Sequence, residues 1–248
     1  MIDKGSRFNT PAPPQPVDPF GGVLLIDKPM GPTSHDIVDR IRRTFGIKKV
    51  GHGGTLDPMA TGLLIMLLGK GTKLSNQFLG SDKTYEGTLR LGAATDSQDA
   101  QGEIINEGDP SGITEEQVRD EMAKHLGDSM QMPPMVSAVK VNGVPLYKQA
   151  RKGKTVERKS RLIHLYQFKL LRFESPDAEF VMRCTKGTYV RTLCHDIGED
   201  LGCYAHLIRL RRTRSGDLDI QQALPLDQAL KMSKDELLKH ILPLHQFA

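Results

Sequence analysis

The stretch that organises this chain covers residues 50–64 and reads VGHGGTLDPMATGLL. Its glycines allow backbone conformations that a Cβ would forbid, and Pro58 fixes the chain direction directly after Asp57. The apolar run Leu63–Leu68 follows and is typical of a buried strand. An Asp-Pro pair by itself is typical of an ordinary turn. The whole stretch predicts more: a glycine-rich loop that holds one carboxylate beside a hydrophobic strand, where it can meet a ligand.

The segment before this loop predicts a strand and then a helix. Val23–Ile26 is a short run typical of a buried strand, and Pro29 stops it. Thr33 and Asp36 have the spacing of a helix N-terminal capping box. Apolar residues then recur at helical spacing until Gly46, where the helix is expected to end.

The remaining elements are predicted from the same patterns. The expected strands cover residues 83–92, 161–173, 178–184 and 207–214, and the expected helices cover residues 69–78, 114–127, 189–201 and a last stretch from Ser233. Residues 95–106 are turn-rich and are expected to form a hairpin loop. Strands and helices mix without strict βαβ alternation, so we expect an α+β fold on a mixed, mainly antiparallel sheet flanked by helices and loops.

Two segments lack such patterns. Residues 1–20 contain five prolines and almost no apolar periodicity, which predicts a disordered tail before a single folded domain over residues 21–248. Residues 132–160 combine prolines, glycines and basic residues, which indicates a long functional loop or flap.

Composition excludes several classes of protein. The 248 residues are 38% hydrophobic and 26% charged, as in an ordinary globular protein with a sizeable core. The three cysteines form no CxxC pair, which suits a reducing cytoplasm. No apolar stretch approaches the roughly 18 residues of a membrane span, and no secretory signal is evident. We therefore expect a cytoplasmic protein without membrane contact, and a monomer, because no long apolar surface stripe is left over.

The net charge of +4 is unevenly distributed. A single basic run is usually a solvated face. Three runs bracketing one candidate loop are more typical of a footprint for RNA phosphates. They lie within residues 40–49, 151–161 and 209–214.

Several blocks of the sequence, in one register from about residue 21 to about residue 216, resemble the TruB family, the bacterial tRNA pseudouridine synthases that act on the uridine at position 55. The blocks are GVLLIDKPMGPTS, GHGGTLDPMATGLL, KTYEGTLRLGAATDSQDAQG, PPMVSAVKVNGVPLYKQAR and CTKGTYVRTLCHDIGEDLGCYAHLIRLRRTRSG. The resemblance implies a pseudouridine-synthase-like catalytic domain that flips a uridine out of the T-loop (TΨC arm) of tRNA and isomerises it. It implies neither a metal ion nor another cofactor.

The resemblance also implies roles for three catalytic residues. Asp57 matches the family's nucleophile, and a carboxylate suffices for covalent catalysis without a cofactor. Arg191 matches the arginine that pairs with this carboxylate and opposes the rise in pKa that burial would cause; a helix-surface charge is the ordinary alternative. Tyr85 matches the tyrosine that stacks on the target uracil, although an aromatic residue in a strand is more often part of the core. Whether Asp57 attacks the sugar or the base, or takes a proton from the ribose, is left open by the sequence.

The substrate-binding residues are implied in the same way. Tyr189 and Leu210 match positions that line the uracil pocket. His52 matches the histidine that fills the space left by the flipped base, and a loop histidine bonded to backbone is its ordinary alternative. The remaining matches are expected contacts to RNA backbone and loop; they are Lys28, Lys140, Tyr147 and Arg151.

One departure from the family concerns the C-terminus. Members usually continue into an RNA-binding domain of the PUA type, whereas this sequence stops at Ala248. We expect from this that the PUA domain is lacking and that no guide RNA is used, because the guide-dependent relatives need that domain.

Other readings are weaker. The Gly69–Thr72 segment lacks the glycine spacing of a phosphate-binding P-loop. The residues Cys194, His195, Cys203 and His206 fit no standard zinc spacing, and no GxSxG is present. The serious alternative is a non-catalytic RNA-binding protein with the same basic surface. Asp57 argues against it, because a pure binder gains nothing from a carboxylate that faces phosphates.

Overall fold

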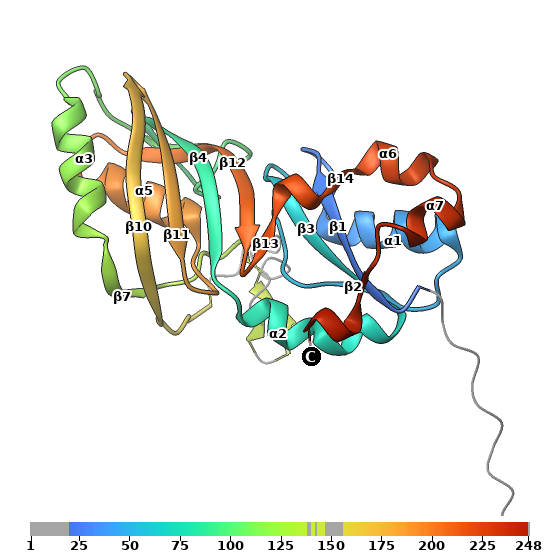
Figure 1. The fold of residues 1–248 in the computed structure, drawn as a ribbon. Coiled ribbons are helices and arrows are strands. Elements are labelled where there is room, and N and C mark those ends of the chain that lie inside the picture. The colour runs from blue at the N-terminus through green and yellow to red at the C-terminus, as the bar shows by residue number, and fades with distance from the viewer. Residues whose placement is uncertain (1–19, 138–139, 142, 147–155, 248) are drawn as a thin grey trace, which may run out of the picture.

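The computed structural model describes residues 20–137, 140–141, 143–146 and 156–247 (Figure 1). Of the predicted tail, residues 1–20, residues 1–19 lie outside the described residues. Phe20, which the prediction includes in the tail, is described and is only 9% exposed, in the hydrophobic core.

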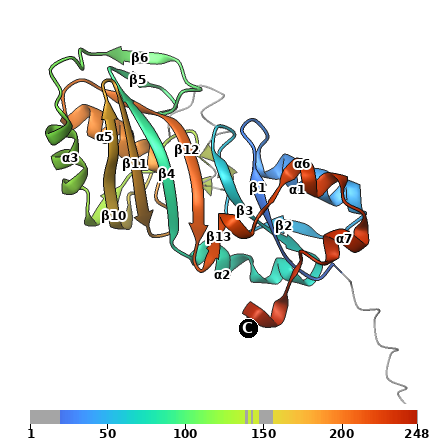
Figure 2. The ribbon, with the colours of Figure 1, turned by 45° about the horizontal axis from the view of Figure 1, so that its top comes forward.

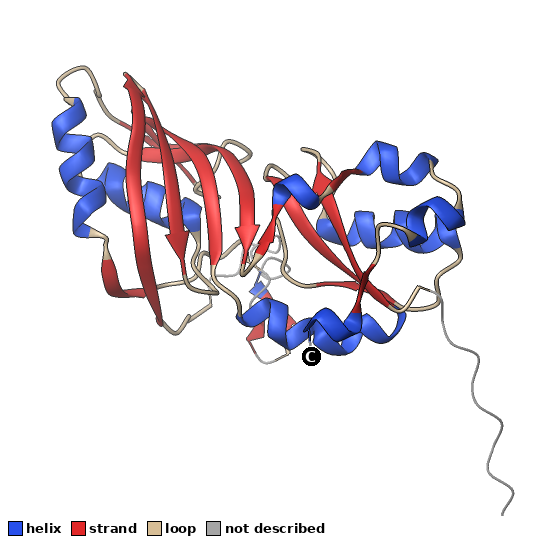
Figure 3. Ribbon diagram, viewed as in Figure 1, coloured by secondary structure: helices blue, strands red, loops and turns tan. Residues whose placement is uncertain are grey.

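The described residues form the following elements (Figure 3). The strands are β1 (Gly22–Lys28), β2 (Val50–His52), β3 (Thr61–Leu68), β4 (Lys83–Leu91), β5 (Ala93–Thr95), β6 (Ile104–Glu107), β7 (Gly127–Gln131), β8 (Lys140–Val141), β9 (Val144–Pro145), β10 (Arg161–Glu174), β11 (Asp177–Cys184), β12 (Ala205–Ser215), β13 (Leu218–Asp219), β14 (Leu224–Pro225) and β15 (Leu242–Pro243). The α-helices are α1 (Ser34–Phe45), α2 (Ser75–Gly80), α3 (Glu115–Lys124), α5 (Val190–Asp200), α6 (Leu226–Lys231) and α7 (Lys234–Leu238), and the 3₁₀ helices are η1 (Gly69–Leu74), η2 (Ile220–Gln222) and η3 (Leu244–Phe247).

Eleven of the described strands form one mixed sheet in the order β14-β1-β3-β12-β4-β11-β10-β7, with β2, β13 and β15 attached at its sides. Along this order β3 runs parallel to β12. The antiparallel pairs include β1–β3, β12–β4, β4–β11, β11–β10 and β10–β7. The α+β fold on a mixed, mainly antiparallel sheet is thus confirmed. Figure 1 shows α3 and α5 beside β10 and β11 at one end of the sheet, and α1, α6 and α7 beside β1 at the other.

The two halves of the sheet meet where β3 runs parallel to β12, and this contact is short. Only Thr61 and Gly62 pair there, with Arg211 and Arg212. Gly62 has φ +99°, and a Cβ on it would lie 2.8 Å from the backbone nitrogen of Arg212 and closer still to its carbonyl oxygen. Gly62 is therefore required where β3 meets β12, because no side chain fits between the two backbones.

Helix boundaries are set by local hydrogen bonds that the sequence reveals. The capping box of Thr33 and Asp36 begins α1, and Gly46 ends it with φ +67°. The helix then buries Ile37, Ile41 and other apolar residues against the sheet. A matching capping box, Thr114 with Gln117, begins α3.

The structure corrects some predicted boundaries. Helix α3 ends at Lys124 rather than at Gly127, and Leu126 is 46% exposed because it has left the helical face. The short helix α6 follows a proline and is absent from the prediction, since six residues carry too little periodicity. The segment 95–106 is a hairpin, as predicted, whose strands β5 and β6 reach into it from both sides (Figure 2).

No helix in the described ranges is both long and apolar enough to cross a membrane.

Candidate active site

Two polar side chains, Ser34 and Lys28, anchor the loop that carries Asp57. Ser34 Oγ donates to Leu56 O (3.0 Å) and accepts from Leu56 N (2.8 Å), which fixes the loop to the start of α1. Lys28 Nζ donates to Pro58 O (3.2 Å) and Ala60 O (2.6 Å). The residues on both sides of Asp57 are therefore anchored to the protein interior, and the carboxylate between them is held in one place.

A third anchor comes from β12. Arg212 is 2% exposed, and its guanidinium donates to Leu63 O (2.8 Å), Thr55 O (3.3 Å) and Gly54 O (3.1 Å). Gly54 has φ +144°, a conformation that side chains rarely adopt. The buried charge is thus compensated by carbonyl dipoles of the loop, which ties the loop to the sheet crossing described above.

Above these anchors lies a cavity of about 250 Å³. Its lining includes Asp57, Tyr85, Tyr189, Arg191 and Leu210, five of the residues singled out from the sequence, together with Lys83 and Arg212. The chain brings these side chains together from the 50–64 loop, β4, the start of α5 and β12. A cavity with one carboxylate, several cations and apolar walls is suited to a small planar ligand with polar edges.

Arg191 lies between two carboxylates. Its Nε is 3.3 Å from Asp57 Oδ2, and its Nη1 is 3.5 Å from Asp99 Oδ2. Its side chain is 4% exposed, and further hydrogen bonds to Ser97 O (3.2 Å) and Val136 O (2.5 Å) hold the guanidinium. The Nε–H does not point at Asp57 in hydrogen-bond geometry, so the contact with Asp57 is an ion pair alone.

The Asp57 side chain is 41% exposed, toward the cavity. Desolvation by the surrounding protein raises the pKa of the Asp57 carboxyl. The Arg191 guanidinium opposes this rise, the Asp99 charge adds to it, and Lys28 opposes it. Arg191 therefore moderates the pKa of Asp57, and burial outweighs it.

Tyr85 is almost fully buried, at 9% exposed, in the wall of the cavity. Burial raises the pKa of its phenol to about 12, although the positive charge of Arg212 opposes the rise. The hydroxyl therefore keeps its proton at neutral pH.

The other predicted site residues lie outside this cavity lining. His52 is half-buried on β2, where Gly54 N donates to its Nδ1 (3.4 Å). Lys28 is 0% exposed, and burial lowers the pKa of its ammonium to about 8. The structure thus places Lys28 against the backbone of the Asp57 loop, where its ammonium donates to Pro58 O and Ala60 O and is not exposed. The side chain of Lys140 and all of Tyr147 and Arg151 lie outside the described residues.

Three residues of the site are absent from the sequence prediction: Asp99, Lys83 and Arg212. Asp99 sits in the β5–β6 hairpin loop, 3% exposed, and its segment reads only as turns. Lys83 opens β4 and donates to Ser81 O (2.6 Å) and Phe78 O (2.9 Å). Of these three residues, only Arg212 has a signal in the sequence that could have identified it. Its charge stands at a position where the alternation along β12 predicts an inward-facing side chain.

The basic runs are only in part a surface for phosphates. In the run at 209–214, Arg212 is buried and Arg211 pairs with Asp27 at 2.6 Å, so neither is a free surface charge. In the run at 40–49, Lys48 and Lys49 are exposed and border a hollow of about 280 Å³ that also meets Lys70 and Lys73. The surface around Lys48 and Lys49 therefore has the grouped positive charge that binds phosphates.

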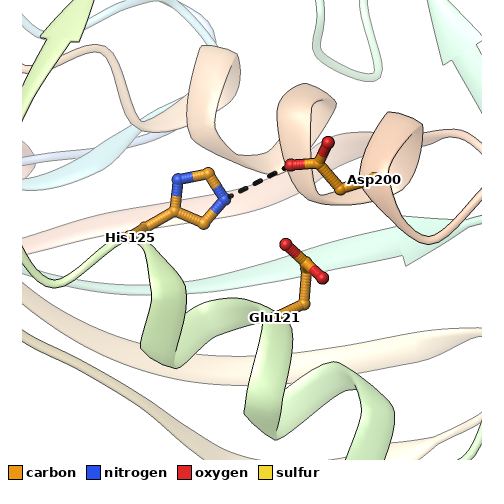
Figure 4. A group of neighbouring side chains, drawn as sticks. All are labelled: Glu121, His125 and Asp200. Atoms are coloured by element: carbon orange, nitrogen blue, oxygen red, sulfur yellow. Dashed lines mark ion pairs between the residues drawn. The ribbon is translucent and has the colours of Figure 1, made fainter.

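One group in the described ranges has the residue types of a metal site: Glu121 and His125 from α3 and its end, and Asp200 from α5 (Figure 4). The ligand atoms lie within 4.8 Å of one another, and His125 Nε2 is 4.0 Å from Asp200 Oδ2. However, Lys124 Nζ already occupies Glu121 Oε2 at 2.6 Å. The group sits at the far end of α5 from Arg191, about 13 Å along the helix, and takes no part in the cavity.

Comparison with protein families gives two matches. Residues 42–190 match the TruB family pseudouridylate synthase (N terminal domain), and residues 191–247 match the tRNA pseudouridylate synthase B C-terminal domain. Among curated proteins, the tRNA pseudouridine synthase B of Opitutus terrae is 51% identical over 234 residues, which cover 94% of this chain and 97% of that protein. The protein of the same name from Syntrophotalea carbinolica is 48% identical over 217 residues, 88% of this chain and 71% of that protein.

Solved structures share the fold. A chain in a crystal structure of a Cbf5-Nop10-Gar1 complex is 30% identical with a TM-score of 0.73, and covers 92% of this chain. A chain in the structure of an H/ACA RNP bound to a substrate RNA containing 2′-deoxyuridine is 27% identical with a TM-score of 0.69. The present chain spans 61% and 60% of the length of these two neighbours, so they support the architecture of the site rather than the assemblies around them.

Proposed function

The chain belongs to the TruB family of pseudouridylate synthases, and from this membership we propose that it isomerises the uridine at position 55, in the T-loop of tRNA, to pseudouridine. The cavity that holds Asp57 is the proposed active site. The observation that carries the proposal is the single carboxylate in the lining of this cavity, which pairs with the buried Arg191 and shares the lining with Tyr85.

The chemistry requires the base to leave the sugar and return in another orientation. The C1′–N1 bond of the uridine breaks, the uracil turns and a C1′–C5 bond forms. C5 then loses its proton and N1 takes up a proton, so the product is an isomer of uridine. We assign Asp57 as the nucleophile that divides this exchange into easier steps. The cavity retains the detached uracil, since its apolar wall from Leu210 and Val190 and its polar rim hold a ring of that size.

Tyr85 and Arg191 support this role in different ways. The neutral phenol of Tyr85 offers a flat apolar ring to the uracil and a hydroxyl that can donate. Arg191 opposes the rise in the pKa of the Asp57 carboxyl that desolvation of the site causes, and so favours the ionised form. Neither role needs a metal ion or a further cofactor, and the proposal includes none.

Access to the target requires the nucleotide to leave its folded loop, which costs a few kcal/mol of stacking. We assign His52 to the space that the uridine leaves, because β2 carries it directly into the Asp57 loop. Lys140, Tyr147 and Arg151 belong to the proposed RNA-clamping flap at residues 132–160 of the catalytic domain. Residues 21–248 act in this account as one catalytic domain and a monomer, without a guide RNA.

The experiment that tests the function maps pseudouridine in a tRNA transcript after incubation with the purified chain alone. We expect conversion at position 55 and at no other uridine. A transcript with cytidine at position 55 is the matched control and should remain unmodified. Conversion at another position, or a need for an added RNA, would contradict the proposed substrate.

A further inference from the structure

A second hollow adjoins the cavity that contains Asp57, which we call the uridine cavity. It measures about 450 Å³, and its walls include Asp128, Leu162, His164, Tyr166, Thr185 and Lys186. Thr185 lines both hollows, so the two share a wall. A ligand that extends out of the first cavity past Thr185 would therefore reach the second hollow.

The shared wall is fixed to the strand that forms the second hollow. His164 N donates to Thr185 Oγ1 (2.9 Å), and Thr185 N donates to His164 O (2.9 Å). Thr188 Oγ1 in turn donates to Thr185 O (2.9 Å) and lines the uridine cavity. These bonds fix Thr185 to β10 and to Thr188.

The surface of the second hollow presents an ordered array of flat groups. Leu162, His164 and Tyr166 occupy alternate positions of β10 and so project from the same face of the sheet. The rings of His164 and Tyr166 lie 4.5 Å apart, and the Arg183 guanidinium lies 4.8 Å from the centre of the Tyr166 ring. Asp128 Oδ1 lies 2.7 Å from His164 Nδ1 and holds the imidazole in place.

This array is open to solvent in the described structure. Leu162 is 66% exposed, Tyr166 is 49% exposed, and Met130, which pairs with Leu162 across β7 and β10, is 64% exposed. Exposed apolar side chains grouped beside a binding cavity are typical of a surface that a ligand covers.

A cation completes the second hollow. Lys186 is exposed and has no ion pair within the described ranges, and it directly precedes Gly187 of the uridine cavity. Flat stacking groups beside an unpaired ammonium group are the combination by which proteins bind single-stranded RNA. The chemistry therefore matches a nucleotide, with its base on the array and its phosphate at Lys186.

We propose that the second hollow binds the nucleotide adjacent to the target uridine, whose base packs against Leu162 and the His164–Tyr166 array. The identity of the ligand as RNA rests on the proposed function. The inference adds a second base-binding subsite and assigns it to the exposed face of β10.

The test measures binding of T-arm hairpin RNA to the chain in an Asp57→Asn background, so that no reaction intervenes. Three RNAs are compared: the intact hairpin, and hairpins in which the base directly 5′ or directly 3′ of the target is replaced by an abasic site. We expect one of the two abasic RNAs to bind roughly 5- to 150-fold more weakly than the intact hairpin, the range for one stacked base.

The protein arm uses Tyr166→Ala and Tyr166→Phe. Tyr166→Ala should weaken binding of the intact hairpin by a factor in the same range. It should bind the affected abasic RNA as tightly as the parent chain does, because the substitution and the abasic site remove the same contact. Tyr166→Phe keeps the ring and should bind as the parent does. Leu171→Ala, at the far end of β10 and 55% exposed in the parent, is the matched control. Lys186→Gln should reduce the slope of log K against log salt by about 0.7.

Two results would overturn the inference. One is that both abasic RNAs bind as tightly as the intact hairpin. The other is that the loss of affinity caused by Tyr166→Ala adds in full to the loss of affinity caused by the abasic site. If the native chain converts T-arm uridine while either result holds, only the second subsite is refuted. If the native chain neither binds nor converts that RNA, the proposed function fails and the inference fails with it.

Discussion

Arg191 and Asp57 form an ion pair of unequal partners: Arg191 Nε lies 3.3 Å from Asp57 Oδ2, yet the arginine side chain is 4% exposed and the aspartate side chain 41%. The cation is thus fixed inside the protein, while the carboxylate faces the cavity. Asp99 holds the other side of the guanidinium at 3.5 Å. This arrangement leaves the Asp57 carboxylate available to a ligand without leaving its charge uncompensated.

The pH dependence of activity follows from the pKa of Asp57. A nucleophilic carboxylate must be ionised, so kcat/KM should fall as the pH drops below that pKa, which lies above the ordinary value of about 3.9 for Asp. Asp99 contributes to the rise, so Asp99→Asn should move the acid limb of kcat/KM to lower pH. Initial rates on a T-arm transcript measure this. Asp217→Asn, an exposed control, should leave the limb in place; a shift to higher pH in Asp99→Asn would contradict the account.

Removal of the Arg212 guanidinium should destabilise the fold. It is the donor to three loop and strand carbonyls, and a buried acceptor without a donor costs about 1–3 kcal/mol. Arg212→Lys, which cannot reach all three, should lower the free energy of unfolding by about 2–5 kcal/mol in urea denaturation. Arg214→Lys, whose exposed pair with Asp219 spans 3.5 Å, should change it by less than about 1 kcal/mol. Equal effects of the two substitutions would refute the anchoring role.

Gly62→Ala should separate the two halves of the sheet. A Cβ at this position meets the backbone of Arg212, and φ +99° is strained for alanine. We expect a loss of several kcal/mol, about 3 or more, or failure to fold. Gly80→Ala is the matched control, because nothing lies within 4 Å of its Cβ and its φ is not in the left-handed region; it should be neutral or stabilising. Thermal melting distinguishes the two.

The buried ammonium of Lys28 should make stability depend on alkaline pH. Its pKa is about 8 in the fold against an ordinary value of 10.5, so the unfolded chain binds more protons between these values. The contribution of Lys28 to the free energy of unfolding should therefore rise as the pH goes from 8 to 10.5, and be lost again as the pH falls through 8. Lys28→Met should flatten this part of the profile relative to the native chain. An unchanged profile would place the ammonium in water.

Much of the fold was predictable because its signals are local. The capping pairs of Thr33 with Asp36 and Ser233 with Glu236 begin α1 and α7 where the sequence indicates. The alternation of Tyr85, Gly87, Leu89 and Leu91 identifies the buried face of β4. Such patterns depend on neighbours in the chain and need no knowledge of the tertiary structure.

The parts that escaped prediction depend on distant contacts. Arg212 looks like one member of a basic run, and only the crossing of β3 and β12 makes it a buried anchor. Lys28 looks like a surface base, and only the path of the 50–64 loop covers it. Asp99 approaches Arg191 because the β5–β6 hairpin folds back over β12. The candidate site was located through Asp57, and the groups that hold it required the structure.

The role of Asp57 is tested with T-arm RNA that carries tritium at C5 of the target uridine, because the new C1′–C5 bond expels that hydrogen. The native chain should release the label, and Asp57→Asn should release none while binding the RNA as tightly as before. Asp96→Asn, an exposed aspartate of the hairpin loop, should release it like the native chain. Release by Asp57→Asn at the native rate would contradict the assignment of Asp57 as the nucleophile.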